Sequence, residues 1–149
     1  MKFGITSNAV SVLRNLLGFK SDIQQSIKAV LLRSSIKSNN NAVELLSGHA
    51  DNTGGYPVPV VSGYLRRMQT FIGPGESKNI PNVGVVRTGN NEFALANGSL
   101  YALTVHDGLG TNSKHGKRPF MQDAIDSEKA HAEFEIKDLL AKKGKERGF

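Results

Sequence analysis

Two helical patterns, one toward each end of the chain, constrain most strongly what this sequence can fold into. The later pattern follows Pro119, which suits the first position of a helix because the amide hydrogen it lacks has no partner there. The apolar side chains after it recur on one helical face, and we expect Phe120 to belong to the core. These positions are Met121, Ile125, Ala132, Ile136, Leu139 and Leu140. Two pairs are spaced for ion pairing along the same helix: Glu133–Lys137 and Asp138–Lys142.

The earlier helical pattern begins at Ser21, which forms a capping box with the glutamine three residues later. Its apolar face consists of Ile23, Ile27, Val30, Leu31 and Ser34. We expect this helix to reach Ser38 and to end at the three asparagines 39–41. Residues 1–20 would form an N-terminal arm or a short helix that stops at Gly18.

The middle of the chain predicts a small antiparallel sheet. β-branched and aromatic residues favour strands over residues 64–71, 83–87 and 92–96. The segment 73–81 contains too many glycines and prolines for regular structure. A turn at residues 88–91 would join the last two strands as a hairpin.

Residues 99–105 are compatible with two structures. The preceding Asn97-Gly98 is a strong local signal for a two-residue hairpin turn, which would make the segment a strand. Tyr101 and Val105 are four residues apart, however, and this is the spacing of one face of a helix. The residues alone leave both possibilities open.

Helices at both ends and strands between them predict an α+β fold, a small antiparallel β-sheet flanked by an N-terminal and a C-terminal α-helix, with long loops. The chain has 149 residues, a length typical of a single domain. We expect the last helix to fray before Gly144, so that residues 141–149 form a basic, flexible tail.

The formal net charge of +6 is concentrated toward the two ends of the chain. Residues 1–50 carry six basic and two acidic side chains, residues 51–113 carry four of each, and residues 114–149 carry nine basic and seven acidic. Basic ends are compatible with nucleic acid or with an acidic protein surface. Solvated lysines that complement the end of a helix are an equally good explanation.

Several chemistries lack the residues that they need. The chain contains no cysteine, which excludes disulfides and thiol catalysis. It also lacks the nucleophile elbow of a hydrolase, a phosphate-binding loop and an apolar run long enough for a membrane span. His106, Asp107 and His115 are the best candidates for a metal or catalytic site, but their spacing matches no metal-binding pattern. We therefore predict that the protein is not an enzyme, with no catalytic, cofactor-binding or metal-binding residue.

Charged side chains are the candidates for contacts with other molecules. They are Arg66, Arg67, His106, Asp107, Lys114, His115, Lys117, Arg118, Lys142 and Lys143. Arg66 and Arg67 would point to opposite faces of a strand, leaving one of them for a partner. The loop at 114–118 can dock on an acidic protein or on phosphates. We expect charge reversal at Lys117 and Arg118 to block assembly without lowering the melting temperature.

Two segments resemble phage neck and tail-completion proteins of the virion morphogenesis group. Pro59–Arg67 (PVVSGYLRR) is similar to that family's Pro-x-x-Thr-Gly-x-Leu-Arg-x segment. The segment from Tyr101 to Phe120 is similar to a second segment of that family. This family segment reads Tyr-Ala, then three or four residues, then Val-Glu-x-Gly-Thr, a loop, Pro-Phe and a helix. The family position at 106 is usually acidic; here it is His106, and Asp107 follows it. The resemblance spans roughly residues 57–140.

This resemblance implies a structural, non-enzymatic protein of a tailed-phage virion. Members form a ring around the DNA channel at the neck or at the head-proximal end of the tail. Six- or twelvefold self-association is then expected, with neighbouring connector, tail-terminator or tail-tube proteins as partners and non-specific contact with DNA in the channel. The protein would be made in a bacterial cytoplasm and would have no membrane partner. The resemblance also implies a short helix over residues 99–105.

An alternative is a small basic protein that binds nucleic acid. The clustered cations could neutralise phosphates, but aromatic residues are few and do not alternate with them as a stacking surface would require.

Overall fold

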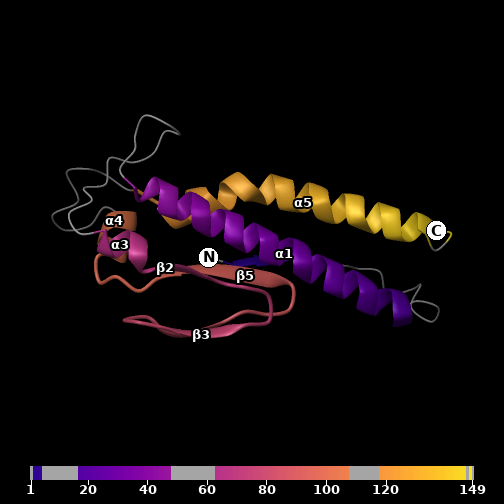
Figure 1. The fold of residues 1–149 in the computed structure, drawn as a ribbon, viewed down its shortest axis with the longest axis horizontal. Helices are drawn as coiled ribbons and strands as arrows, with labels where there is room; N and C mark the ends of the chain where they lie inside the picture. Colours follow the sequence, from indigo (N-terminus) through magenta and orange to yellow (C-terminus); the bar gives the residue numbers. More distant parts are fainter. Residues whose placement is uncertain (1, 5–16, 48–62, 108–117, 147, 149) are drawn as a thin grey trace.

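The computed structural model describes residues 2–4, 17–47, 63–107, 118–146 and 148. Two long helices dominate the fold; β1 precedes the first of them, and the other short elements lie between them in the sequence (Figure 1). In chain order the elements are β1 (Lys2–Gly4), α1 (Leu17–Leu45), α3 (Tyr64–Arg67), β2 (Gln69–Ile72), β3 (Ser77–Ile80), β4 (Gly84–Arg87), β5 (Glu92–Asn97), α4 (Ala102–Asp107) and α5 (Phe120–Glu146).

The long helices α1 and α5 lie side by side and run in opposite directions over one face of the sheet (Figure 1). Arg33 donates a hydrogen bond to Glu135 at 3.1 Å, and Asn41 donates to Ser127 at 3.0 Å. Between these polar contacts the helices bury apolar side chains. The main core contains Ile27, Val30, Leu31, Ala42, Leu46, Phe93, Leu95, Ala102, Val105, Phe120, Ala124, Ile125, Ala132 and Ile136.

The central strand β5 separates two hydrophobic cores. It pairs antiparallel with β1 on one side and with β2 on the other, and Phe71 faces Leu95 in the register. Successive side chains of a strand point to opposite faces. Phe93 and Leu95 therefore pack against the helices, while Ala94 and Ala96 pack in a second cluster on the other face.

The second cluster is covered by a hairpin of β3 and β4. These strands pair antiparallel, with Ile80 opposite Gly84, and form a two-stranded sheet of their own. Ile72 and Ile80 are fully or nearly fully buried between the two sheets. The described elements thus form three layers: two helices, a three-stranded sheet and a hairpin.

The ends of both long helices differ from the sequence prediction. α1 begins at Leu17, so Gly18 and Ser21 lie inside the helix and do not end or cap one. It also continues through the asparagines 39–41 to Leu45. Helix propensities differ by less than 1 kcal/mol for such residues, and tertiary contacts readily exceed that. The earlier part of the expected N-terminal arm, residues 5–16, lies outside the described residues.

The predicted C-terminal tail is largely helical. α5 continues past Gly144 to Glu146, so residues 141–146 belong to the helix and do not form a flexible tail. Ion pairs support its last turns: Lys142 contacts Asp138 at 2.7 Å, as the spacing predicted, and Lys143 contacts Glu146 at 3.5 Å. Because α5 begins at Phe120, Pro119 immediately precedes it, and the Pro119 carbonyl accepts from the Asp123 amide.

Three predictions about the strands were wrong. Residues 64–67 form helix α3 because Gly63 adopts a left-handed conformation that turns the chain, and the strand begins only at Gln69. Residues 77–80, expected to be irregular, form β3. The glycines and the two prolines of the segment 73–81 all lie outside this strand. The turn at 88–91 does not make a hairpin, because β4 pairs with β3 while β5 belongs to the other sheet.

The predicted α+β architecture is confirmed. Helices flank a small antiparallel β region, strands form at 84–87 and 92–97, and α4 resolves the ambiguity at residues 99–105 in favour of a helix. Phe120 is completely buried, as expected. None of the described helices is long and apolar enough to cross a membrane.

Candidate assembly site

A buried polar cluster holds α3 and the start of α4 together at one end of the molecule. The Asn97 side chain donates to the Leu65 carbonyl at 2.8 Å and to Gln69 Oε1 at 3.0 Å, and it accepts from the Ser99 amide at 2.9 Å. Asn97, Gln69 and Ser99 are all buried. A buried amide is stabilising only when its polar atoms are paired, so this cluster fixes the geometry of the chain around it.

The turn of the β3–β4 hairpin is attached to the same place. Asn82 donates from its side chain to the Gly98 carbonyl at 2.8 Å, while the Gly98 amide donates to the Met68 carbonyl at 3.1 Å. There is no room for a side chain at Gly98, since an added Cβ would lie 2.9 Å from the carbonyl oxygen of Pro81. The hairpin, α3 and α4 therefore meet at one close junction.

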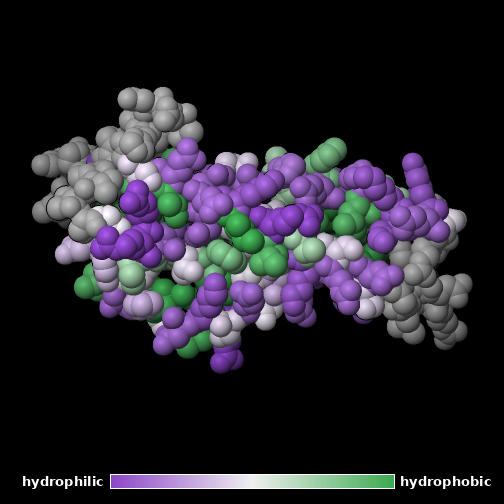
Figure 2. Space-filling view, in the orientation of Figure 1, coloured by the Kyte–Doolittle hydropathy of each residue, from purple (hydrophilic) through white to green (hydrophobic). Residues whose placement is uncertain are grey.

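Large apolar side chains are exposed around this junction. Leu100, Tyr101 and Leu103 are 72%, 66% and 63% exposed, and Tyr64 and Val83 are also exposed. We call these five residues the apolar end. Ala102 and Val105 are the buried residues of α4, so Leu103, its other apolar side chain, points away from the core. Figure 2 shows apolar side chains among hydrophilic ones at this end and along the edge formed by the hairpin.

His106 and Asp107 are the last two residues of α4 and lie beside the start of α5. His106 Nδ1 lies 2.9 Å from Asp107 Oδ1, and the imidazole packs edge-on against the Phe120 ring with centroids 5.5 Å apart. The Arg118 amide donates to the His106 carbonyl at 3.2 Å. The structure therefore brings together three of the predicted site residues, His106, Asp107 and Arg118, although they come from two helix ends.

Arg118 is not a surface cation. It is only 3% exposed, and its Nη1 has no hydrogen-bond partner among the described residues. Reversing its charge would place a carboxylate in a buried position, which is costly without a partner. Contrary to the sequence-based expectation, we therefore expect charge reversal at Arg118 to lower the melting temperature as well as to disturb any contact nearby.

Arg66 and Arg67 lie on helix α3 rather than on a strand, and both are exposed. Adjacent helical residues point about 100° apart, not to opposite faces. Both arginines can therefore border the apolar end, in contrast to the prediction that only one would be available on a given side.

Lys142 and Lys143 lie at the other end of the molecule, in the last turns of α5 (Figure 1). The hydrogen bond to Asp138 and the charge of that carboxylate raise the pKa of Lys142. Both lysines have an acidic neighbour on their own helix, and neither belongs to the group around α4.

The remaining predicted residues, Lys114, His115 and Lys117, lie outside the described residues. In the part of the chain that is described, no three histidine or acidic side chains lie close enough together to hold a metal ion. His106 and Asp107 therefore form a pair rather than a metal site within that part.

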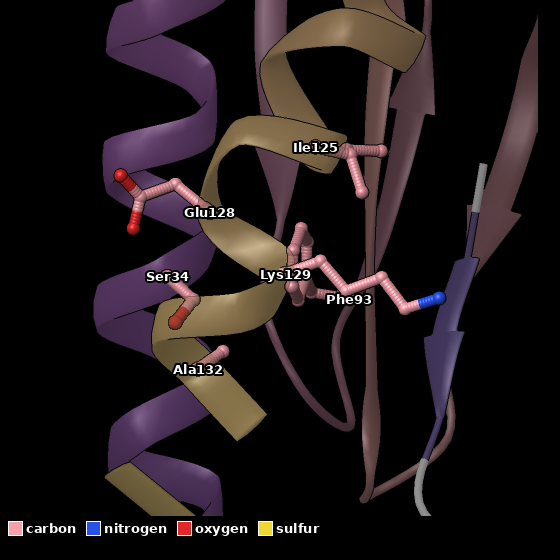
Figure 3. Close-up of a pocket in the computed structure, with 6 residues that line it drawn as sticks. All are labelled: Ser34, Phe93, Ile125, Glu128, Lys129 and Ala132. Atoms are coloured by element: carbon pink, nitrogen blue, oxygen red, sulfur yellow. The ribbon is translucent and has the colours of Figure 1, made fainter. Parts of the chain in front are cut away.

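A narrow hollow lies elsewhere, between α1, α5 and β5. It is lined by Ser34, Phe93, Ile125, Glu128, Lys129 and Ala132 (Figure 3). Its volume is about 160 Å³ including space open to solvent, and it is too narrow to admit a water molecule. Glu128 and Lys129 extend in opposite directions from α5. The hollow is a narrow packing gap between the two helices and β5.

Sequence reasoning missed the apolar end, although one signal was present. If Ala102 and Val105 face the core, Leu103 must face outward, but this conclusion requires the helix to be known first. The spacing of Tyr101 and Val105 predicted one shared face, whereas Tyr101 lies before α4 and is exposed while Val105 is buried. Val83 and Tyr64 carried no such signal, because only the folded chain places the hairpin turn and α3 beside α4.

The chain matches none of the protein-family models, curated proteins or solved structures with which it was compared.

Proposed function

We propose that this chain is a structural virion protein of a tailed bacteriophage, a ring-forming neck (head–tail connector) or tail-completion component around the DNA channel. One observation carries the proposal. The two segments that resemble the neck and tail-completion proteins, Pro59–Arg67 and Tyr101–Phe120, are far apart in the sequence but contribute adjacent elements at one end of the molecule. α3 belongs to the first segment and α4 to the second, and Asn97 connects them through the Leu65 carbonyl.

The surface at this end suits a protein that assembles. Contiguous exposed apolar side chains on a small protein mark sites of interaction with other proteins or membranes. The short helix over residues 102–107, the buried Phe120 and the long C-terminal helix also occur in the order that the resemblance implies.

The distribution of charge supports protein assembly over nucleic-acid binding. α5 carries seven acidic and five basic side chains, although the chain as a whole is basic. Several described cations also contact groups of the same chain: Arg33 with Glu135, Lys142 with Asp138 and Lys78 over the Phe71 ring. A surface that binds phosphates would instead need cations directed together toward one groove.

The mass of the purified protein in solution tests the proposal. We expect light scattering to show a discrete ring, or a monomer that becomes one when a virion partner is added, at both low and high salt. Binding through six or more phosphate contacts would instead weaken by about a thousandfold or more between 50 and 200 mM salt. A monomer that changes mass only with DNA, and only at low salt, would replace this proposal with a small basic nucleic-acid-binding protein.

A further inference from the structure

The apolar end is a preformed surface. Three hydrogen bonds fix its backbone, from Asn97 to Leu65, from Gly98 to Met68 and from Asn82 to Gly98. The fold does not need its outward side chains to be apolar, because Ala102 and Val105 already supply the part of α4 that enters the core. Leucine and tyrosine at these exposed positions therefore indicate a partner that covers them.

A second unusual surface lies on α5. Residues Asp123, Ala130, Phe134, Asp138 and Ala141 recur at helical spacing on one side of the helix, and all are exposed. We call them the outer stripe of α5. Phe134 is 68% exposed, and its neighbours on the stripe are Ala130 and Asp138, four residues away on either side. Asp123 and Asp138 provide carboxylates toward the two ends of the stripe.

These two surfaces differ in the charge that each offers. The apolar end is bordered by Arg66, which forms no ion pair with a described residue, whereas the outer stripe begins with Asp123. Asp138, farther along the stripe, is paired with Lys142 at 2.7 Å. Asp123 also forms no salt bridge with a described residue, and burial and the neighbouring Asp126 raise its pKa. An apolar end docked on a second apolar end would bring like charges together and leave Phe134 uncovered.

We propose that the apolar end of one copy docks on the outer stripe of α5 in a second copy. The contact is heterologous, because different patches of the two copies meet, and repeating it around an axis closes a ring when the rotation between neighbouring copies divides a full turn evenly. This inference rests on the proposed ring-forming function and specifies the contact that builds the ring. Tyr101 and Leu103 then cover Phe134, and Arg66 approaches Asp123, the carboxylate of the stripe that forms no salt bridge with a described residue.

Crosslinking tests the contact directly. Because the chain contains no cysteine, each variant below carries a single reactive thiol. Three single-cysteine variants are needed: Leu103→Cys, Phe134→Cys and the control Ile36→Cys. Ile36 is exposed on α1 and belongs to neither surface. Two variants that carry tags of different size are mixed in equal amounts and treated with a short bismaleimide, and products are separated under denaturing conditions.

We expect the mixture of Leu103→Cys and Phe134→Cys to give about ten times more crosslinked heterodimer than the mixture of Leu103→Cys and Ile36→Cys, as a contact between central interface residues implies. Crosslinking of Leu103→Cys mainly to itself would show a two-fold contact between apolar ends and overturn the proposal. Product no more abundant than in the control mixture would overturn it as well.

A second pair of variants checks the direction of the contact. Leu103→Ser removes one surface and Phe134→Ser removes the other, and each change should weaken self-association about tenfold or more if these residues are central to the interface. Each variant keeps one intact surface, so mixing them should produce a dimer of one copy of each and nothing larger. If the mixture behaves like either variant alone, the two surfaces do not meet.

The outcomes separate this inference from the proposed function. A wild-type ring of discrete mass without the 103–134 crosslink would leave the ring and reject this contact. A 103–134 crosslink in a protein that forms no ring with or without virion partners would leave the contact and reject the ring-forming function.

Discussion

Asn97 determines how the junction of α3 and α4 is built. Its buried side chain forms hydrogen bonds with Leu65, Gln69 and Ser99. A replacement that cannot form hydrogen bonds therefore leaves several buried polar groups unpaired. We expect Asn97→Leu to lower the free energy of unfolding by about 2–4 kcal/mol, as measured by urea denaturation. The exposed Asn91→Ala should change it by no more than about 0.5 kcal/mol. An equal effect of the two substitutions would contradict this role of Asn97.

Glu135 makes the contact between α1 and α5 sensitive to pH. Burial alone would raise the pKa of Glu135, but the hydrogen bond from Arg33 and the charges of Arg33, His131 and Lys37 lower it below the ordinary 4.5. A lowered pKa in the folded state contributes stability above the unfolded value, and this contribution disappears as the pH falls through the folded value.

We therefore expect Glu135→Gln to reduce the stability by about 0.5 kcal/mol at pH 7, because the pair is partly exposed. The difference from the wild type should shrink at pH 3, because Glu135 gains a proton as the pH falls through its lowered pKa. Thermal unfolding at the two pH values measures the effect, with Glu133→Gln as a control without a described salt bridge. A difference that is no smaller at pH 3 would show that the charge of Glu135 is not its cause.

At the scale of elements, the asparagines of α1 show how tertiary contacts maintain a helix through residues that do not favour it. Asn39 accepts a hydrogen bond from Gln69 at 3.4 Å, and Asn41 donates to Ser127 on α5 at 3.0 Å. Asn40 between them is exposed. Two of the three residues thus connect α1 to its neighbours.

Substitution of these asparagines should therefore have opposite effects. We expect Asn40→Ala to stabilise the protein by about 0.5 kcal/mol, since alanine favours a helix more than asparagine. Asn41→Ala gains the same propensity but loses the bond to Ser127, and it should be neutral or destabilising by up to about 1 kcal/mol. Chemical denaturation of both variants gives the comparison; stabilisation of equal size by both would show that the contact to α5 contributes nothing.

The junction between elements also depends on Gly98. An added methyl group would lie 2.8 Å from the Met68 side chain and 2.9 Å from the Pro81 backbone. We expect Gly98→Ala to cost about 1–3 kcal/mol, because the hairpin and α3 must both move away. Gly144→Ala, the same substitution inside α5, should instead stabilise by about 0.5–1 kcal/mol. Differential scanning calorimetry should therefore show shifts of the melting temperature in opposite directions.

At the scale of the whole molecule, assembly should change which surfaces react with solvent. If copies associate through the apolar end and the outer stripe of α5, hydroxyl-radical modification of Tyr101, Leu103 and Phe134 should fall severalfold in the assembled protein. Ile36 and Val85 are exposed but lie on other surfaces, and their modification should remain unchanged. Protection of Ile36 and Val85 without protection of Phe134 would place the contact elsewhere.

The predictions that succeeded depend on patterns repeated over many residues. The apolar stripe through Ile125 and Ile136 specified a helix after Pro119, and these two residues and Ala132 lie in the core. Met121 and Leu139 are partly buried against it, whereas Leu140 is exposed. Long periodic segments are reliable because each apolar side chain adds to the same preference for one buried face. The α+β class followed from these helices together with the strands between them.

The predictions that failed depend on single residues at element ends. Gly18, Ser21 and the asparagines 39–41 are local signals worth about 1 kcal/mol or less each, and packing of α1 on α5 exceeds them. The burial of Arg118 was not predictable either, because an arginine beside a basic loop has the same sequence pattern whether it points outward or inward.

The sequence by itself determined the two long helices and the β-rich middle, because these depend on periodicity along the chain. Only the tertiary structure decided that β4 pairs with β3, that β5 is buried on both faces, and that Tyr64, Val83 and Leu103 lie at one end. The physical reason is that pairing and burial join residues distant in sequence, and a free energy shared between distant residues leaves no local pattern.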